Sequence, residues 1–249
     1  MNLLSAAAKV SSLTMLSRIT GLLRETLIAR SFGASEWTDA FNVAFRIPNL
    51  LRRLFAEGAF SQAFVPILGE ISANEDKTRA KILINAVATL LFWSLLATVI
   101  LGVVGAPMLI LAIATGFSGG PAYDASVVMT KIMFPYIGLI SLVSLSAGVL
   151  NTYHRFAVPA FTPVLLNLAL IASAIFLAPH LNQPIYALSI GVLLGGILQL
   201  AIQIPALAKL GLLPRIGLLP SAIKAAATNP DRSEEPTSEL QSRGLISYA

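Results

Sequence analysis

Charged side chains occur inside the first two apolar segments of the chain, where a membrane-spanning helix normally carries none. Within residues 1–60 they include Arg18, Arg24, Glu25, Arg30, Asp39, Arg46, Arg52, Arg53 and Glu57. A charge in hydrocarbon costs several kcal/mol, so such groups face a water-filled cavity or an opposite charge. A guanidinium always carries its charge and presents a planar fork of donors that matches phosphate oxygens. The arginines therefore predict an anion site, and three converging guanidinium groups would suit a pyrophosphate.

The polar residues of the second segment recur at helical spacing. Asp39, Asn42, Arg46, Asn49 and Arg53 lie three or four residues apart, which places them on one stripe of a helix. The opposite surface, suited to lipid or to neighbouring helices, consists of Phe41, Val43, Phe45, Leu50, Leu51 and Leu54. Pro48 removes a backbone donor within the stripe and predicts a kink there.

A second interpretation places some of these charges at the cytoplasmic interface, where arginines contact lipid head groups. Arg52, Arg53 and Glu57 fit the interface as well as the cavity, and Arg46 fits either. Arg18, Arg24 and Asp39 lie deeper in their segments, which favours the cavity. The expected substrate-binding set is Arg18, Arg24, Asp39, Asn49, Arg52 and Arg53, and the expected charge-pairing or gating set is Glu25, Asp39 and Glu57.

Composition places the chain in a membrane and argues against an enzyme. Hydrophobic residues make up 56% of the chain and charged residues 12%, whereas soluble domains carry about 25% charged residues. Cysteine is absent, which excludes disulfides and thiol chemistry. The sequence contains no zinc-protease motif, no glycine-rich phosphate loop after a strand and no plausible Ser/His/Asp set. We therefore expect a transporter with no catalytic residue, metal or cofactor.

Six apolar stretches have the length of a spanning helix. They cover residues 4–32, 37–54, 81–104, 125–150, 159–178 and 184–207, with a short amphipathic piece at 58–71. The apolar stretch directly after the third of these spans, residues 105–117, is too short to cross the membrane again. Lys and Arg concentrate in alternate loops, which predicts that the N-terminus is cytoplasmic. Asn167, Gln199 and Gln203 are expected to bond across helices, and Gly191 and Gly195 to allow close helix packing.

The C-terminal segment differs in character from the rest. Residues 1–225 are expected to form the transmembrane domain, and residues 226–249 form a polar tail. The segment 232–242, RSEEPTSELQS, closely resembles RSEEHTSELQS, the translation of a common sequencing adapter, and departs from it only at Pro236. We expect the tail to be artefactual from about residue 232. The alternative is a natural, solvated linker.

Two stretches carry a family resemblance. SRITGLLRETLIARSFGAS and TDAFNVAFRIPNLLRRLFAEGAFSQAFVPIL closely resemble the N-terminal signature of the MurJ/MviN family of bacterial lipid II flippases, which belong to the multidrug/oligosaccharidyl-lipid/polysaccharide exporter superfamily. The resemblance implies an all-α, 14-helix fold with two six-helix lobes around a cationic cavity. It implies movement of undecaprenyl-pyrophosphate-linked peptidoglycan precursor from the cytoplasmic to the periplasmic leaflet by alternating access. Important cavity residues match Arg18, Arg24, Asp39 and Arg52, and Glu25 stands where many members have Asp.

The chain corresponds to the first lobe alone. We therefore expect an inactive fragment of an inner-membrane flippase for cell wall synthesis, whose cavity needs the second lobe. Its expected partners are the lipid-linked precursor and membrane lipids, with no nucleic acid. A coupling ion or the membrane potential is expected, with any ion site in the second lobe. The alternatives are a related polysaccharide-lipid or drug exporter, and a half-length membrane scaffold or partner subunit.

Overall fold

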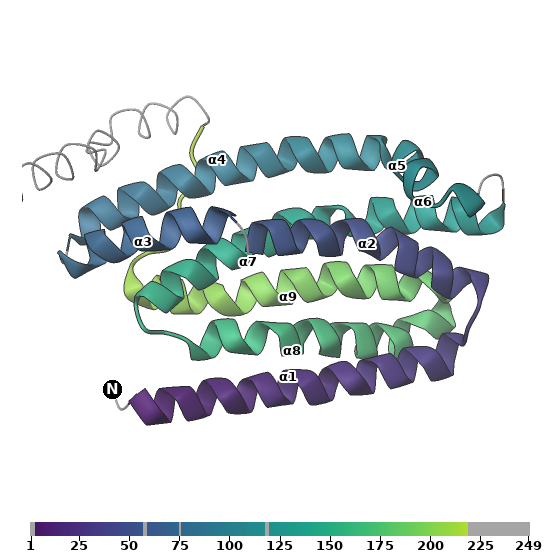
Figure 1. Ribbon diagram of the computed structural model, residues 1–249, viewed down its shortest axis with the longest axis horizontal. Helices are drawn as coiled ribbons and strands as arrows, with labels where there is room; N and C mark the ends of the chain where they lie inside the picture. The colour runs from purple at the N-terminus through teal and green to yellow at the C-terminus, as the bar shows by residue number, and fades with distance from the viewer. Residues whose placement is uncertain (1–2, 57–58, 75, 118–119, 219–249) are drawn as a thin grey trace, which may run out of the picture.

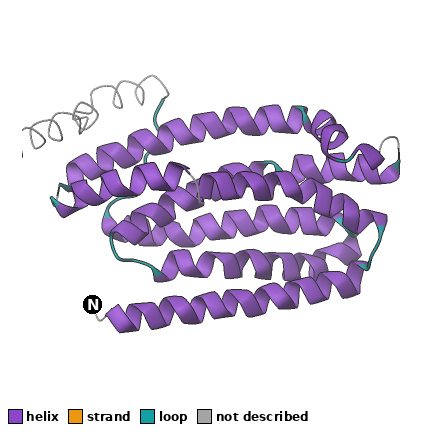
Figure 2. Ribbon diagram, viewed as in Figure 1, coloured by secondary structure: helices purple, strands orange, loops and turns teal. Residues whose placement is uncertain are grey.

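A computed structural model describes residues 3–56, 59–74, 76–117 and 120–218, without the side chains of residues 3–6, 51–56, 59–63 and 117. The described part consists of helices and connecting loops (Figure 2). Long helices run side by side along one axis (Figure 1). The α-helices of the described part are α1 (Leu3–Phe32), α2 (Glu36–Ala56), α3 (Ala59–Ala73), α4 (Lys77–Val104), α5 (Ala106–Ile113), α6 (Pro121–Met133), α7 (Pro135–Thr152), α8 (Ala157–Ala172) and α9 (Tyr186–Leu210). A π-helical turn, Ser173–Leu177, and a 3-10 turn, Ala178–His180, extend α8, and Thr115–Phe117 forms another 3-10 turn.

Four helical segments of the described chain are long and apolar enough to cross a membrane. They are Lys77–Val104, Pro121–Thr152, Ala157–His180 and Tyr186–Leu210. These four correspond to the last four of the six predicted spans. α1 and α2 also form as long helices, at nearly the predicted positions, but their charges keep them outside this set.

Prolines and glycines explain where the helices break. The predicted span 125–150 consists of two helices, α6 and α7, which meet at Phe134. The predicted span is confirmed as one apolar segment, Pro121–Thr152. It divides there because Pro135 has no N–H to continue the hydrogen-bond ladder. α4 ends at Gly105 and the eight-residue α5 follows, which confirms that the apolar stretch after α4 does not span again.

Small residues bring α8 and α9 together. A Cβ added at Gly195 would lie 2.6 Å from Leu166 Cδ1, and one added at Gly191 would lie 2.9 Å from Ser173 Oγ. The predicted close packing at these glycines is confirmed. α1 lies on the other side of α8 and packs chiefly against it (Figure 1). The rest of α1 is largely uncovered, and its Met15 and Leu22 are exposed. α1 is therefore the edge helix of the domain.

The chain leaves α9 through a left-handed glycine and crosses to α4. Gly211 has φ 72°, which favours glycine. Beyond it, Arg215 N donates to Asn85 Oδ1 at 2.8 Å and Gly217 N donates to Thr89 Oγ1 at 3.0 Å. Trp93 Nε1 donates to the Gly217 carbonyl at 3.0 Å. Side chains at four-residue steps on α4 thus hold the extended segment 211–218.

Candidate functional site

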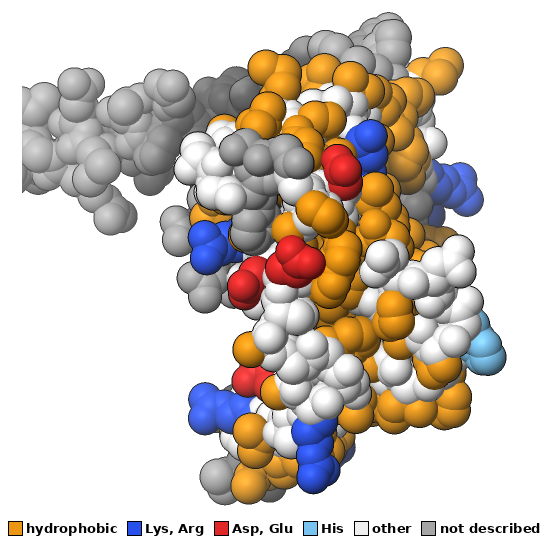
Figure 3. Space-filling model, turned by 90° about the vertical axis from the view of Figure 1, so that its right-hand side faces the viewer, with side chains coloured by type: hydrophobic (Ala, Val, Ile, Leu, Met, Phe, Trp, Pro, Cys, Tyr) orange, Lys and Arg blue, Asp and Glu red, His pale blue; other side chains and the backbone are white. Residues whose placement is uncertain are grey.

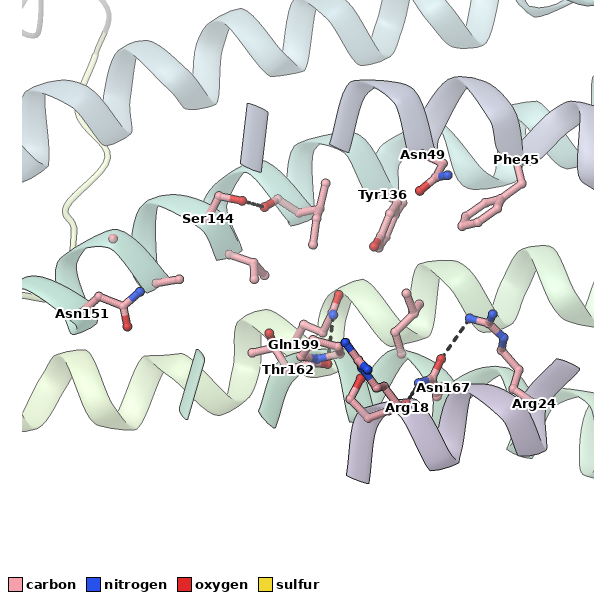
Figure 4. Close-up of a pocket in the computed structure, with 18 of the residues that line it drawn as sticks. Arg18, Arg24, Phe45, Asn49, Tyr136, Ser144, Asn151, Thr162, Asn167 and Gln199 are labelled. Carbon is pink, nitrogen blue, oxygen red and sulfur yellow. Dashed lines mark hydrogen bonds between the residues drawn. The ribbon is translucent and has the colours of Figure 1, made fainter. Parts of the chain in front are cut away.

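A cavity of about 910 Å³ lies between the helices of the domain. Its volume is within the range of small-molecule sites, which is about 300–1,000 Å³. α1, α8 and α9 contribute one wall, and α2, α3 and α7 contribute the other (Figure 4). Its polar lining consists of Ser17, Arg18, Arg24, Asn49, Tyr136, Ser144, Asn151, Thr162, Asn167 and Gln199.

The α1 residues of the cavity share one helix face. Ser17, Gly21 and Arg24 are four and three residues apart, so successive turns of α1 present them to the same side. Arg18 adjoins this face and also lines the cavity. The structure therefore brings together Arg18 and Arg24, two of the arginines that the sequence assigned to an anion site.

A buried asparagine holds the Arg24 guanidinium. Arg24 Nη1 donates to Asn167 Oδ1 at 2.9 Å. The amide of Asn167 donates in turn to the Ser17 carbonyl at 3.1 Å and to Thr20 Oγ1 at 3.2 Å. Asn167 is 6% exposed, and these bonds confirm the prediction that it bonds across helices. α8 thereby fixes both the backbone of α1 and the position of the Arg24 side chain.

Arg24 also forms an ion pair with its neighbour. Its Nη2 lies 2.9 Å from Glu25 Oε1, and the two side chains are 23% and 70% exposed. Exposed pairs contribute little because solvent screens them, so Glu25 is a weak competitor for an incoming anion. A guanidinium has five N–H donors. Two of them bond Asn167 and Glu25, and the other three have no partner among the described residues.

The second glutamine predicted on α9 behaves differently from the first. Gln199 lines the cavity, and its Nε2 donates to the Thr162 carbonyl at 2.9 Å, which confirms the predicted bond across helices. Gln203 is fully buried, and neither of its amide atoms has a partner in the described part of the chain. The predicted cross-helix bond of Gln203 is therefore wrong for the described residues.

Among the α2 stripe residues whose side chains the structure describes, only Asn49 reaches the cavity. Asn49 lines the cavity, whereas Asp39 and Arg46 are exposed and contribute no lining atoms. Phe45 lies one turn before Asn49 and also lines the cavity. Phe45 also packs against the buried core, which confirms the neighbouring-helix part of its predicted surroundings. Phe41 stacks on Phe45 with ring centroids 5.7 Å apart and packs into the core against neighbouring helices.

The remaining predicted residues lie outside what the structure describes. Arg52 and Arg53 fall in the last turns of α2, but their side chains are not described, and Glu57 lies entirely outside the described residues. Sequence reasoning did not single out Ser17, Ser144, Asn151 or Thr162. Ser144 and Asn151 are seven residues apart on α7, and this spacing is the signal that could have found them.

The surface around the domain is asymmetric in charge. Viewed from one end, acidic and basic side chains gather mainly on one side, above and below a recess, while much of the remaining surface is apolar (Figure 3). On the edge helix and the helix after it, the exposed charged residues include Arg18, Glu25, Asp39 and Arg46. An apolar surface suits lipid, and a charged recess suits water or a polar ligand.

Comparison with known proteins places the chain in a family. The family model for lipid II flippase MurJ matches residues 28–229. A relative from Burkholderia cenocepacia, named lipid II flippase MurJ, is 57% identical over 221 residues, which cover 88% of this chain and 43% of the relative. A solved structure of lipid II flippase MurJ in an inward closed conformation aligns with a TM-score of 0.71 at 28% identity, covering 88% of this chain and 46% of that one.

The chain thus spans less than half the length of these relatives. The adapter-like residues 232–242 lie beyond the family match, which ends at residue 229. The match covers most of the chain, and the helical arrangement agrees with a solved member. The chain belongs to the lipid II flippase MurJ family.

Proposed function

We propose that this domain forms the arginine-bearing part of a lipid II flippase and binds the diphosphate of lipid II in its cavity. The observation that supports this most strongly is Arg24, which lines the cavity while Asn167 holds it and leaves three donors for a ligand. Charge-assisted hydrogen bonds to phosphate are about twice as strong as neutral ones. Arg18 lines the same cavity and adds a second positive charge.

Glu25 gives Arg24 a weak counter-ion while the site is empty. In the absence of substrate, the Glu25 carboxylate neutralises part of the charge on Arg24. A diphosphate carries more negative charge than one carboxylate and displaces Glu25 from the guanidinium. When the substrate leaves, Glu25 re-forms the pair and lowers the affinity for rebinding. In this proposal Asp39, Asn49, Arg52, Arg53 and Glu57 also contribute polar or charged groups to substrate binding.

The proposed topology has six spans with a cytoplasmic N-terminus. α1 and α2 would join the four apolar segments because their exposed charges face a shared cavity rather than lipid. A second lobe would close that cavity, and rocking of the two lobes would expose the arginines to each leaflet in turn. An outward-moving anion is favoured by an inside-negative membrane potential, by about 2.3 kcal/mol per charge per 100 mV, so the potential is a proposed driving force.

A chimera tests the function in cells. Residues of this chain replace the matched part of the Burkholderia cenocepacia relative, and growth is scored in a flippase-depleted bacterium. Arg24→Ala should abolish growth because the cavity loses its positioned guanidinium. Arg30→Ala is the matched control, since Arg30 is exposed on the same helix and does not line the cavity. Normal growth of the Arg24 variant at equal membrane levels would show that the proposed site is not the substrate site.

A further inference from the structure

One polar atom in the cavity wall is buried and lacks a partner. Gln199 is 3% exposed, and its Oε1 accepts no hydrogen bond from the described residues. The orientation of the amide is settled by its neighbour: the Thr162 carbonyl is an acceptor, so Nε2 must face it and Oε1 must face away. Oε1 points toward the space between the two walls (Figure 4). An unpaired buried acceptor costs free energy, so this atom is prepared for a donor that arrives in the cavity.

The local backbone explains why Gln199 is held in this pose. Pro163 has no N–H to donate to the Pro159 carbonyl four residues earlier. The Thr162 hydroxyl donates to that carbonyl at 2.8 Å instead. The Gln199 amide donates to the Thr162 carbonyl. The Gln199 side chain is therefore held by the backbone of the proline-containing turn of α8 rather than by another side chain.

The distance between Gln199 and the arginine site follows from α8. Gln199 bonds residue 162 and Arg24 bonds residue 167 of the same helix. Five residues correspond to about 7.5 Å along a helix axis. A group attached directly to a diphosphate held by Arg24 can therefore reach the acceptor.

We propose that Gln199 is a specificity-determining residue that accepts a hydrogen bond from a neutral hydroxyl or amide N–H on the headgroup attached to the diphosphate. This inference rests on the proposed function. The donor is neutral because the described lining carries Arg18 and Arg24 but no acidic residue, so a cationic donor would be repelled. The arginines would thus recognise the anionic link, and Gln199 would distinguish a substrate with a sugar or peptide from a bare lipid diphosphate.

The test compares two lipids on the purified 249-residue chain in nanodiscs. The probes are lipid II, which bears the sugar and peptide, and undecaprenyl diphosphate, which bears neither. Gln199→Leu should weaken lipid II binding about fivefold, the loss expected for one neutral hydrogen bond. It should leave the affinity for undecaprenyl diphosphate unchanged. Gln199→Met, an unbranched replacement of similar length, repeats the measurement if the leucine variant does not fold.

Gln203→Leu is the matched control. Gln203 lies one turn further along α9, is 0% exposed and does not line the cavity. This variant should leave both affinities unchanged. Equal losses for both lipids, or no loss for either, in the Gln199 variants would overturn the role of Gln199 while leaving the arginine site intact. If the native chain binds neither diphosphate lipid better than undecaprenol, the proposed function itself fails.

Discussion

Asn167→Leu should weaken diphosphate binding because it releases the Arg24 side chain. In the native chain, the Asn167 carbonyl oxygen accepts a 2.9 Å bond from Arg24 and so holds the guanidinium at the cavity wall. A hydrogen bond to a charged group contributes about 1.5–3 kcal/mol. If that energy positions Arg24, its loss should weaken binding of lipid II by roughly 10- to 150-fold, because 1.4 kcal/mol corresponds to a factor of ten.

The same substitution also removes two neutral bonds that link α8 to α1. Thr20→Val controls for these bonds, since it removes one neutral acceptor of the Asn167 amide and leaves the Arg24 bond in place. We expect it to change affinity by less than about tenfold, the scale of one neutral hydrogen bond. Lipid II titration by native mass spectrometry gives the affinities, and thermal unfolding reports any loss of fold.

A double-mutant cycle separates positioning from packing. If Asn167 acts through the guanidinium, Asn167→Leu should have no further effect on lipid II affinity in the Arg24→Ala background. Additive losses for the two substitutions would show that Asn167 acts independently of Arg24. That result would show that Asn167 does not act by positioning the Arg24 guanidinium.

Two further substitutions test the elements that support the site. Gly195→Val should lower the free energy of unfolding by about 1–3 kcal/mol, because a Cβ there would lie 2.6 Å from a leucine carbon of α8. Gly69→Ala is the control and should not lower the free energy of unfolding, because no atom lies within 4 Å of the new Cβ. A similar loss of stability for both variants in thermal melts would argue against close α8–α9 packing. Trp93→Leu should speed tryptic cleavage within residues 211–218, because it removes the bond to the Gly217 carbonyl. Phe92→Leu keeps that bond and serves as its control, so an unchanged rate in the Trp93 variant would contradict the role of this contact.

The sequence predicts the helices well, and it predicts that Arg18 and Arg24 face a cavity, for physical reasons. Arg18 and Arg24 could be assigned to a cavity because a charge deep in an apolar segment has few other stable positions. The π-helical turn and the break between α6 and α7 could not be predicted from the pattern of apolar residues. That pattern is the same on both sides of Pro135.

The helical spacing of residues predicts which of them share a helix face, but it does not predict what covers that face. The α2 stripe illustrates this: Asn49 reaches the cavity while Asp39 and Arg46 remain exposed. For Phe45 the sequence left lipid and neighbouring helices open, because an aromatic side chain suits both, and the structure packs it against the core at the cavity wall. The bond between Arg24 and Asn167 joins residues 143 positions apart, so local pattern carries no signal for the pairing.

The most direct measurement is a structure of the chimera with lipid II bound. We expect diphosphate density within hydrogen-bonding distance of the Arg24 guanidinium, with Asn167 still accepting from the same side chain and Glu25 displaced. Diphosphate density elsewhere in the molecule, with the Arg24–Glu25 pair intact, would show that Arg24 does not bind the diphosphate.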